Sequence, residues 1–179
     1  MTLILNTKRG GSMNISNKVV RHLKAHPGII EIIPEVLSKV NLPGDRSNFK
    51  CSHRFEKVVG KSGLILTKPI TLSEITWFAQ RNDRLMPSRV IPDSSSIETD
   101  IVSLIATPAE DNSYELVSAW FGEFAPKEPW DPDLASDPPA YEESIHFWCS
   151  HGLVYTSETM LEPFESTWGN ILKMTVHNN

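Results

Sequence analysis

Histidine, arginine and hydroxyl residues are the side chains of this 179-residue sequence whose chemistry is easiest to specify. Cleavage of RNA without a metal needs one group that takes the ribose 2′-hydroxyl proton and another that protonates the leaving oxygen. Histidine can serve in both roles near neutral pH, while arginines and hydroxyl donors stabilise the charge on the phosphate. Residues of these types that fall on predicted strands or at their ends are His53, Arg54, Arg81, Arg84, Arg89, Thr99, Ser118 and His151.

Ser118 is the most unusual of these positions. On a strand over residues 114–121, alternation would place Tyr114, Leu116, Ser118 and Trp120 on one face and the residues between them on the other. A serine is less usual on such a large apolar face, so Ser118 is a candidate for a functional role. It could equally form a hydrogen bond across the sheet, and a single histidine beside a strand is also often structural.

A zinc site is a second possible chemistry, because the tripeptide Cys-Ser-His occurs twice, at residues 51–53 and 149–151. Residues two apart in a strand share a face, so the pairs Cys51 with His53 and Cys149 with His151 could together form a tetrahedral Cys₂His₂ set. A single intervening residue is shorter than the usual zinc spacing, which favours coincidence and two buried cysteines. We therefore predict neither a metal nor another cofactor.

The net charge of −5 conceals an uneven distribution along the chain. Residues 1–90 carry 15 Lys and Arg against 6 Asp and Glu, whereas residues 91–179 carry 2 Lys, no Arg and 16 acidic residues. A basic half could bind phosphate groups. The two halves could equally pack together and neutralise each other, so charge alone does not establish a nucleic-acid partner.

The elements that must position these residues are predicted as helices first and a sheet second. We expect helices from Ser16 to about residue 25 and from Pro34 to about residue 40. Strands are expected over 49–59, 64–67, 88–91, 98–106, 114–121 and 153–156, with helices over 71–80 and 141–149 and a Pro-rich loop over 122–140. This order predicts an α+β fold: N-terminal helices followed by an antiparallel β-sheet, which a C-terminal helix and loop cover.

The length fits one domain, which we predict over residues 13–179. Residues 1–12 are predicted to be a disordered tail or a misplaced start, because residues 8–13 read like a translated purine-rich ribosome-binding site before a start codon. No apolar run approaches the about 18 residues that a membrane helix needs, and the N-terminus lacks a secretory pattern. Two cysteines do not make a disulfide framework, so we expect a cytoplasmic protein without a membrane partner.

Three stretches of the sequence carry a resemblance to known proteins: RHLKAHPGIIEIIPEVLSKVNLPGD, the strand pair that follows it, and a hairpin ending in YELVSAWFG. Their order is similar to that of the barnase–EndoU–colicin–RelE group of small bacterial and phage ribonucleases. That group places one or two helices before a four-stranded antiparallel sheet and cleaves RNA without a metal. The segments FAPKEPWD and ESIHFWCSHGLV are similar to uncharacterised bacterial proteins, and the resemblance covers residues 19–153.

The resemblance implies a metal-independent endoribonuclease, of the kind that acts as the toxin of a toxin–antitoxin or contact-dependent system. It implies a base or acid at His53, a phosphate ligand at Arg89, and hydroxyl donors at Thr99 and Ser118. From their residue types we further predict a catalytic residue at His151 and substrate-binding cations at Arg54, Arg81 and Arg84. RNA and an antitoxin or immunity protein would be the partners. The acidic loop over 123–137 departs from what RNA binding favours. The alternative is a non-enzymatic immunity- or antitoxin-like protein whose acidic surface binds a partner.

Overall fold

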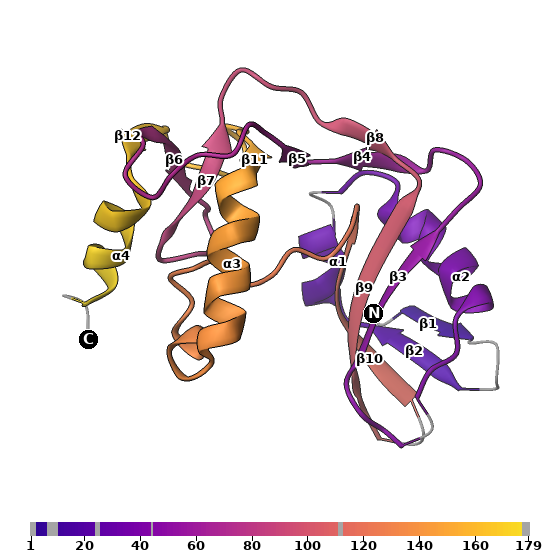
Figure 1. The fold of residues 1–179 in the computed structure, drawn as a ribbon. Helices are drawn as coiled ribbons and strands as arrows, with labels where there is room; N and C mark the ends of the chain where they lie inside the picture. Colours follow the sequence, from indigo (N-terminus) through magenta and orange to yellow (C-terminus); the bar gives the residue numbers. More distant parts are fainter. Residues whose placement is uncertain (1–2, 7–10, 24–25, 44, 111–112, 177–179) are drawn as a thin grey trace. The chain divides into compact units, whose positions relative to one another are not determined.

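The computed structural model describes residues 3–6, 11–23, 26–43, 45–110 and 113–176. Their contacts divide the chain into two compact units, which Figure 1 shows together with the labels of the elements. Unit 1 comprises residues 1–62 and 98–124, and unit 2 comprises residues 63–97 and 125–179. Residues 1–62 thus belong to unit 1 and residues 63–97 to unit 2. The chain then returns to unit 1 over residues 98–124, and the remainder belongs to unit 2.

Unit 1 is built on a five-stranded sheet with strand order β1-β2-β10-β9-β3. Its strands are β1 (Leu3–Asn6), β2 (Ser12–Ile15), β10 (Ser113–Phe121), β9 (Ile101–Pro108) and β3 (Phe49–Arg54). β2 and β10 run parallel, and the other neighbours are antiparallel. A two-stranded sheet joins β4 (Gly60–Ser62) to β8 (Ile97–Thr99).

The core of unit 1 lies between this sheet and two helices, α1 (Asn17–Leu23) and α2 (Ile29–Lys39). α2 buries Ile29, Ile33, Val36 and Leu37, which recur at the spacing of one helical face. They pack in one cluster with buried side chains of β2, β3, β9 and β10. One face of the sheet is thus apolar and covered by helices, and strand alternation leaves its more polar residues on the other face.

Unit 2 has a five-stranded sheet of its own, with strand order β12-β6-β7-β11-β5. The strands are β12 (Phe164–Ser166), β6 (Thr76–Gln80), β7 (Pro87–Ile91), β11 (His151–Val154) and β5 (Leu64–Leu66). β7 and β11 run parallel, and the other pairs are antiparallel. The helices of the unit are the 3₁₀ turn η1 (Pro132–Ser136), α3 (Pro138–Ser150) and α4 (Trp168–Val176). Trp148 of α3 and Trp168 of α4 pack with Phe78 of β6 in one buried cluster.

α3 has clear local start signals. The Asp137 carboxylate accepts a hydrogen bond from the Ala140 amide at 3.2 Å, and two prolines occupy the first turn.

The loop that precedes α3 is attached to unit 2 through the indole groups of two tryptophans. Trp130 donates to the Pro87 carbonyl at 2.9 Å, and Trp148 donates to the Pro126 carbonyl at 3.2 Å. The Pro-rich loop is therefore held against the rest of unit 2 by these two hydrogen bonds.

The predicted fold class is wrong. The first described elements are strands β1 and β2 rather than helices, and the described chain is 36% strand and 26% helix. Neither five-stranded sheet is purely antiparallel, and α3 packs with the sheet of unit 2 instead of covering a single sheet. The physical reason is long-range pairing: Met13 and Ile15 of β2 are fully buried because β2 lies beside β10, about a hundred residues later.

The expected helix over 71–80 is also wrong. The capping contact forms, since the Thr71 amide donates to Glu74 Oε2 at 2.8 Å, but the chain makes only a turn there. Residues 76–80 form β6 because Phe78 and Ala79 are fully buried in the sheet of unit 2. Tertiary packing thus overrides a correct local signal.

Residues 3–6 and 12 lie in paired strands, whereas residues 1–2 and 7–10 fall outside the described residues. The tail or misplaced start over 1–12 therefore stays a prediction, as does the single domain over 13–179. No helix within the described ranges is long and apolar enough to cross a membrane.

Candidate functional site

The predicted site residues are divided between the two units. Unit 1 contains His53, Arg54, Thr99 and Ser118, and unit 2 contains Arg81, Arg84, Arg89 and His151. Neither unit alone holds the complete predicted set.

His53 and Ser118 lie on opposite faces of the unit 1 sheet. His53 is half-buried, sits opposite the fully buried Val102, and packs edge-on against Phe55 with ring centroids 4.7 Å apart. Ser118 pairs with Ile105 on the other face. A base at His53 and a hydroxyl donor at Ser118 are separated by the sheet, so these two residues do not line one site.

A β-bulge puts Ser118 on that face. The register of β10 against β9 shifts between Leu116 and Ser118, which leaves Val117 exposed and reverses the alternation beyond it. Tyr114 and Leu116 face the core, but so do Ala119 and Phe121, whereas Ser118 and Trp120 turn away. The predicted apolar face shared by all four even-numbered residues is therefore wrong.

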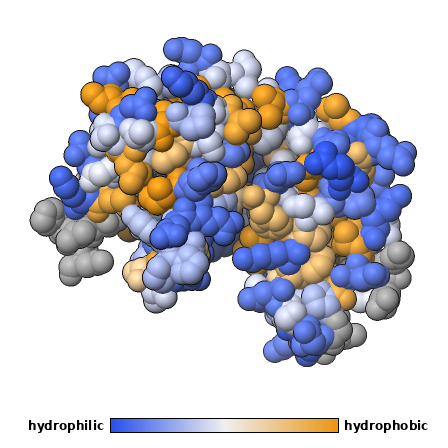
Figure 2. Space-filling model, viewed as in Figure 1, coloured by the Kyte–Doolittle hydropathy of each residue, from blue (hydrophilic) through white to orange (hydrophobic). Residues whose placement is uncertain are grey.

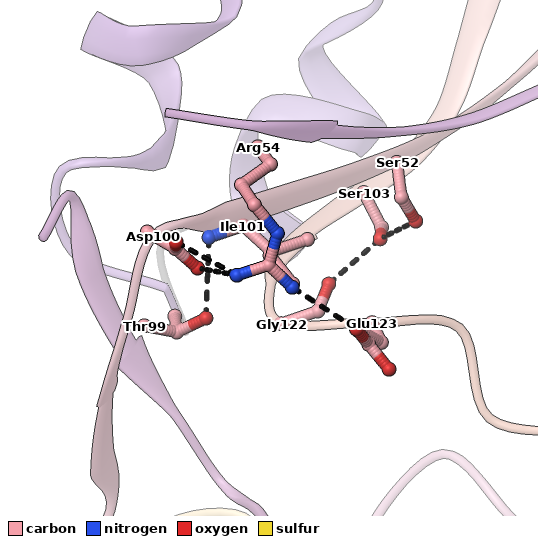
Figure 3. Close-up of polar contacts among 8 residues, drawn as sticks. All are labelled: Ser52, Arg54, Thr99, Asp100, Ile101, Ser103, Gly122 and Glu123. Carbon is pink, nitrogen blue, oxygen red and sulfur yellow. Dashed lines mark hydrogen bonds and ion pairs between the residues drawn. The ribbon is translucent and has the colours of Figure 1, made fainter. Parts of the chain in front are cut away.

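Arg54 forms the centre of a polar cluster at the end of β3, which Figure 3 shows. Its Nη1 lies 2.6 and 2.7 Å from the two Asp100 carboxylate oxygens, and its Nη2 lies 3.4 Å from Glu123. The Arg54 side chain is 62% exposed, so this pairing contributes little to stability and can be exchanged for another anion.

Hydroxyl groups surround the same strand ends (Figure 3). Thr99 Oγ1 accepts from the Ile101 amide at 3.2 Å, and Ser103 donates to the Gly122 carbonyl at 2.7 Å. Ser52 lies beside Ser103, with hydroxyl oxygens 2.6 Å apart. Arg54 and Thr99 thus lie near each other at the start of β9, and their roles in a site stay predictions. The sequence analysis did not select Ser52 or Ser103. The feature that could have indicated them is a serine inside each of the strands β3 and β9.

Arg89 is 3% exposed and is bound entirely within unit 2. Its Nη1 lies 3.0 Å from the carbonyl oxygens of Trp148 and Cys149 and 2.9 Å from that of His151. The Trp148 and Cys149 carbonyls lie in the last turn of α3, where a cation meets the negative end of the helix dipole, and His151 begins β11. Burial lowers the pKa of Arg89, which nevertheless stays protonated. Its role as a phosphate ligand stays a prediction.

His151 is held at the junction of α3 and β11. Its ring stacks on Phe147 with centroids 3.9 Å apart. Its Nδ1 lies 2.9 Å from the Phe147 carbonyl oxygen and 3.1 Å from the Ser150 hydroxyl. Arg89 and His151 do come together, but they meet through the His151 backbone carbonyl rather than through its imidazole.

Arg81 forms a buried ion pair with Glu128, whose side chain is 5% exposed. The Arg81 Nη2 atom lies 2.8 Å from Glu128 Oε2. Burial raises the pKa of Glu128, and the attraction of Arg81 opposes that rise only in part. Arg81 is therefore occupied inside unit 2, whereas Arg84 is exposed. The sequence carries no local signal for this pair, because Arg81 and Glu128 lie 47 residues apart.

The two Cys-Ser-His tripeptides, considered above as halves of a zinc site, lie in different units. Cys51 lies in unit 1 and Cys149 in unit 2, and both are free thiols. Burial raises the pKa of Cys51 to about 11 and also raises the pKa of Cys149. Among the residues that the structure describes, no three His, Cys, Asp or Glu side chains are grouped so that they could share a metal ion.

The topology redistributes the charges of the two sequence halves. Unit 1 carries 11 Lys and Arg against 10 Asp and Glu, because the acidic β9–β10 hairpin returns to it. Unit 2 carries 6 Lys and Arg against 12 Asp and Glu. Figure 2 shows hydrophilic residues over α3 with hydrophobic residues exposed beside them. The strong asymmetry that remains is an excess of acid in unit 2.

Comparisons with protein-family models, with curated proteins and with solved structures found no match to this chain. Its function must therefore be inferred from its own residues and their geometry.

Proposed function

We propose that the protein is a non-enzymatic binding protein of the immunity or antitoxin type, and that unit 2 presents an acidic surface to a basic partner protein. The observation that supports this is the way unit 2 uses its charges. Arg81 binds Glu128, and Arg89 binds carbonyls at the end of α3 and the start of β11. The acidic surface, which consists of Asp133, Glu142 and Glu143, is exposed to solvent.

Lys127 is the one Lys or Arg between residues 125 and 150, and it is already paired. It lies 3.5 Å from Asp131 and also contacts Asp133, and these two aspartates raise its pKa. A basic partner would meet little local repulsion on this segment. Charge complementarity of this kind accelerates encounter and selects the partner, and salt weakens it.

Neutralising the acidic surface is expected to weaken binding of a basic probe. The variant Asp133→Asn, Glu142→Gln, Glu143→Gln should bind a Lys/Ser peptide about tenfold more weakly than the unaltered protein at about 50 mM salt, because exposed charge pairs contribute about 0.5 kcal/mol each. Titration calorimetry measures the difference.

The matched control removes three exposed acids of unit 1 through Glu31→Gln, Glu35→Gln and Glu56→Gln. Its affinity for the peptide should stay within about twofold of the unaltered protein. Equal loss in both variants would show attraction to net charge alone and would contradict a dedicated surface in unit 2.

A metal-independent endoribonuclease is the second candidate, and the cluster around Arg54 favours it. This cluster offers an exposed guanidinium with Ser52, Thr99 and Ser103 hydroxyls nearby, as a phosphate-binding site requires. A phosphate would have to replace Asp100 on Arg54. His53 lies across the sheet from Ser118, so proton transfer by these two in one site is not supported.

Incubation with total RNA in EDTA separates the two candidates. On the main proposal, RNA stays intact, and expression of the protein alone leaves the growth of a bacterial host unchanged. On the second, RNA is cut, and Arg54→Ala lowers the rate whereas the exposed control Lys57→Ala does not. Cleavage with that pattern would overturn the non-enzymatic proposal.

A further inference from the structure

A shallow groove of about 520 Å³ lies in unit 2 between α3 and the segment 69–72 that follows β5. Ile70 and Leu72 form one wall, and Tyr141, Ile145 and Cys149 of α3 form the other. Leu72 is 43% exposed, and Ile145 is half-buried. Apolar side chains on both walls thus face solvent in a concave site, which is unusual unless something covers them.

The two walls are fastened to each other by the backbone. The Thr67 amide donates to the Ser150 carbonyl at 2.8 Å, and the Ile70 amide donates to the Cys149 carbonyl at 2.9 Å. The turn beyond Leu72 is closed by the Thr71 amide, which donates to Glu74 at 2.8 Å. The groove is therefore preformed, and a ligand need not order it on binding.

The charged groups at the groove identify the chemistry of its occupant. Glu142 lines the α3 wall, and Glu74 lies in the turn that closes the opposite wall. Lys68 adjoins the groove at Pro69, and His146 lines it. Glu142 is the acidic residue among those that line the groove, and Glu143 follows it on α3, so the acidic residues near the groove are Glu74, Glu142 and Glu143. A basic segment with apolar side chains complements both features.

We propose that this groove binds the apolar face of a basic amphipathic helix from the partner protein, an inference that rests on the proposed function. α3 has 13 residues and so spans about 20 Å, which matches a partner helix of similar length laid alongside it. Such helices place apolar anchors at one face and bases at the other, as helix-in-groove recognition requires. The acidic surface then attracts the helix, and Ile145 and Leu72 hold its anchors.

Two peptides of about 12 residues with equal positive charge test this inference, one with Leu on one helical face and one with Ser at those positions. The unaltered protein should bind the Leu peptide at least about tenfold more tightly. Ile145→Ser and Leu72→Ser should each abolish most of that preference without changing affinity for the Ser peptide. Leu161→Ser removes a leucine elsewhere in unit 2 that is somewhat more exposed than Leu72, and it should change neither. Leu72→Ser keeps the test decisive if Ile145→Ser fails to fold.

The outcomes separate this inference from the proposal on which it rests. Equal affinity for both peptides, lost on substitution of Asp133, Glu142 and Glu143, would overturn the groove and leave the acidic surface standing. A Leu preference that survives Ile145→Ser and Leu72→Ser would also overturn the groove. Binding of neither peptide at about 50 mM salt would overturn the proposed function itself.

Discussion

Arg89→Ala is expected to lower the free energy of unfolding by about 3 to 5 kcal/mol, because it removes three charge-assisted hydrogen bonds from a buried guanidinium to α3 and β11. The guanidinium of Arg89 is the cation within reach of the Trp148, Cys149 and His151 carbonyls at the end of α3 and the start of β11. At 3% exposure the site admits little water to replace it. The loss should therefore affect α3, β7 and β11 together.

Denaturant unfolding followed by tryptophan fluorescence measures this loss, since Trp148 and Trp168 are buried in the same unit. Arg89→Lys should retain part of the stability, because a lysine keeps the charge but its nitrogen ends one bond short of the position of Arg89 Nη1. Arg84→Ala, at an exposed arginine of unit 2, should leave the midpoint unchanged. A stable Arg89→Ala protein that had lost RNA cleavage would contradict the structural role and restore the predicted phosphate ligand.

Arg81→Met is expected to cost about 3 kcal/mol of stability at about pH 8 and clearly less at about pH 5. Arg81 supplies the largest attraction that opposes the effect of burial on Glu128. Without it, the Glu128 carboxylate at 5% exposure would be a buried charge lacking its ion-pair partner. At lower pH that carboxyl can take up a proton and become neutral, which relieves most of the cost.

The sign of this pH dependence follows from the direction of the pKa shift. Burial raises the pKa of Glu128 above its ordinary value of 4.5, so the folded protein holds this proton more tightly than the unfolded chain does. The contribution of Glu128 to stability is therefore complete below 4.5 and is lost as pH rises through the raised pKa. Removing Arg81 raises that pKa further and makes the loss larger.

The control for this prediction is the double variant Arg81→Met, Glu128→Gln. Its stability relative to the unaltered protein should change far less between about pH 5 and about pH 8, because the titrating carboxyl is gone. Comparing the free energy of unfolding of each variant with that of the unaltered protein at the same pH cancels the effect of distant carboxylates that titrate in both. If the stability loss of Arg81→Met relative to the unaltered protein grew as the pH fell, a raised pKa at Glu128 would be contradicted.

Several local elements could be read from the sequence because their signals lie within a few residues. The hairpin expected over 98–106 and 114–121 is present as β9 and β10, and the helix expected over 141–149 is present within α3. Asp137 and the two prolines after it explain why α3 starts where it does.

Two features of the site could not be read in this way, because residues distant in sequence create them. The pairing of β2 with β10 brings the Asn14 side chain close to Ser113, 99 residues later, and Asn14 Nδ2 donates a hydrogen bond of 3.2 Å to Ser113 Oγ. The carbonyls that bind Arg89 lie about 60 positions away. Hydrophobic pattern reports which residues are buried, but it does not report which partner buries them.

The residue types available for chemistry, the local hairpin, α3 and the overall excess of acid all follow from the sequence alone. Which of those residues share a face or a unit depends on the tertiary fold. The bulge before Ser118 turns it away from the face on which His53 packs, and a shift of one residue reverses every later side chain. Because Arg81 is paired with Glu128 and Arg89 is buried, most of the exposed charges of unit 2 are acidic.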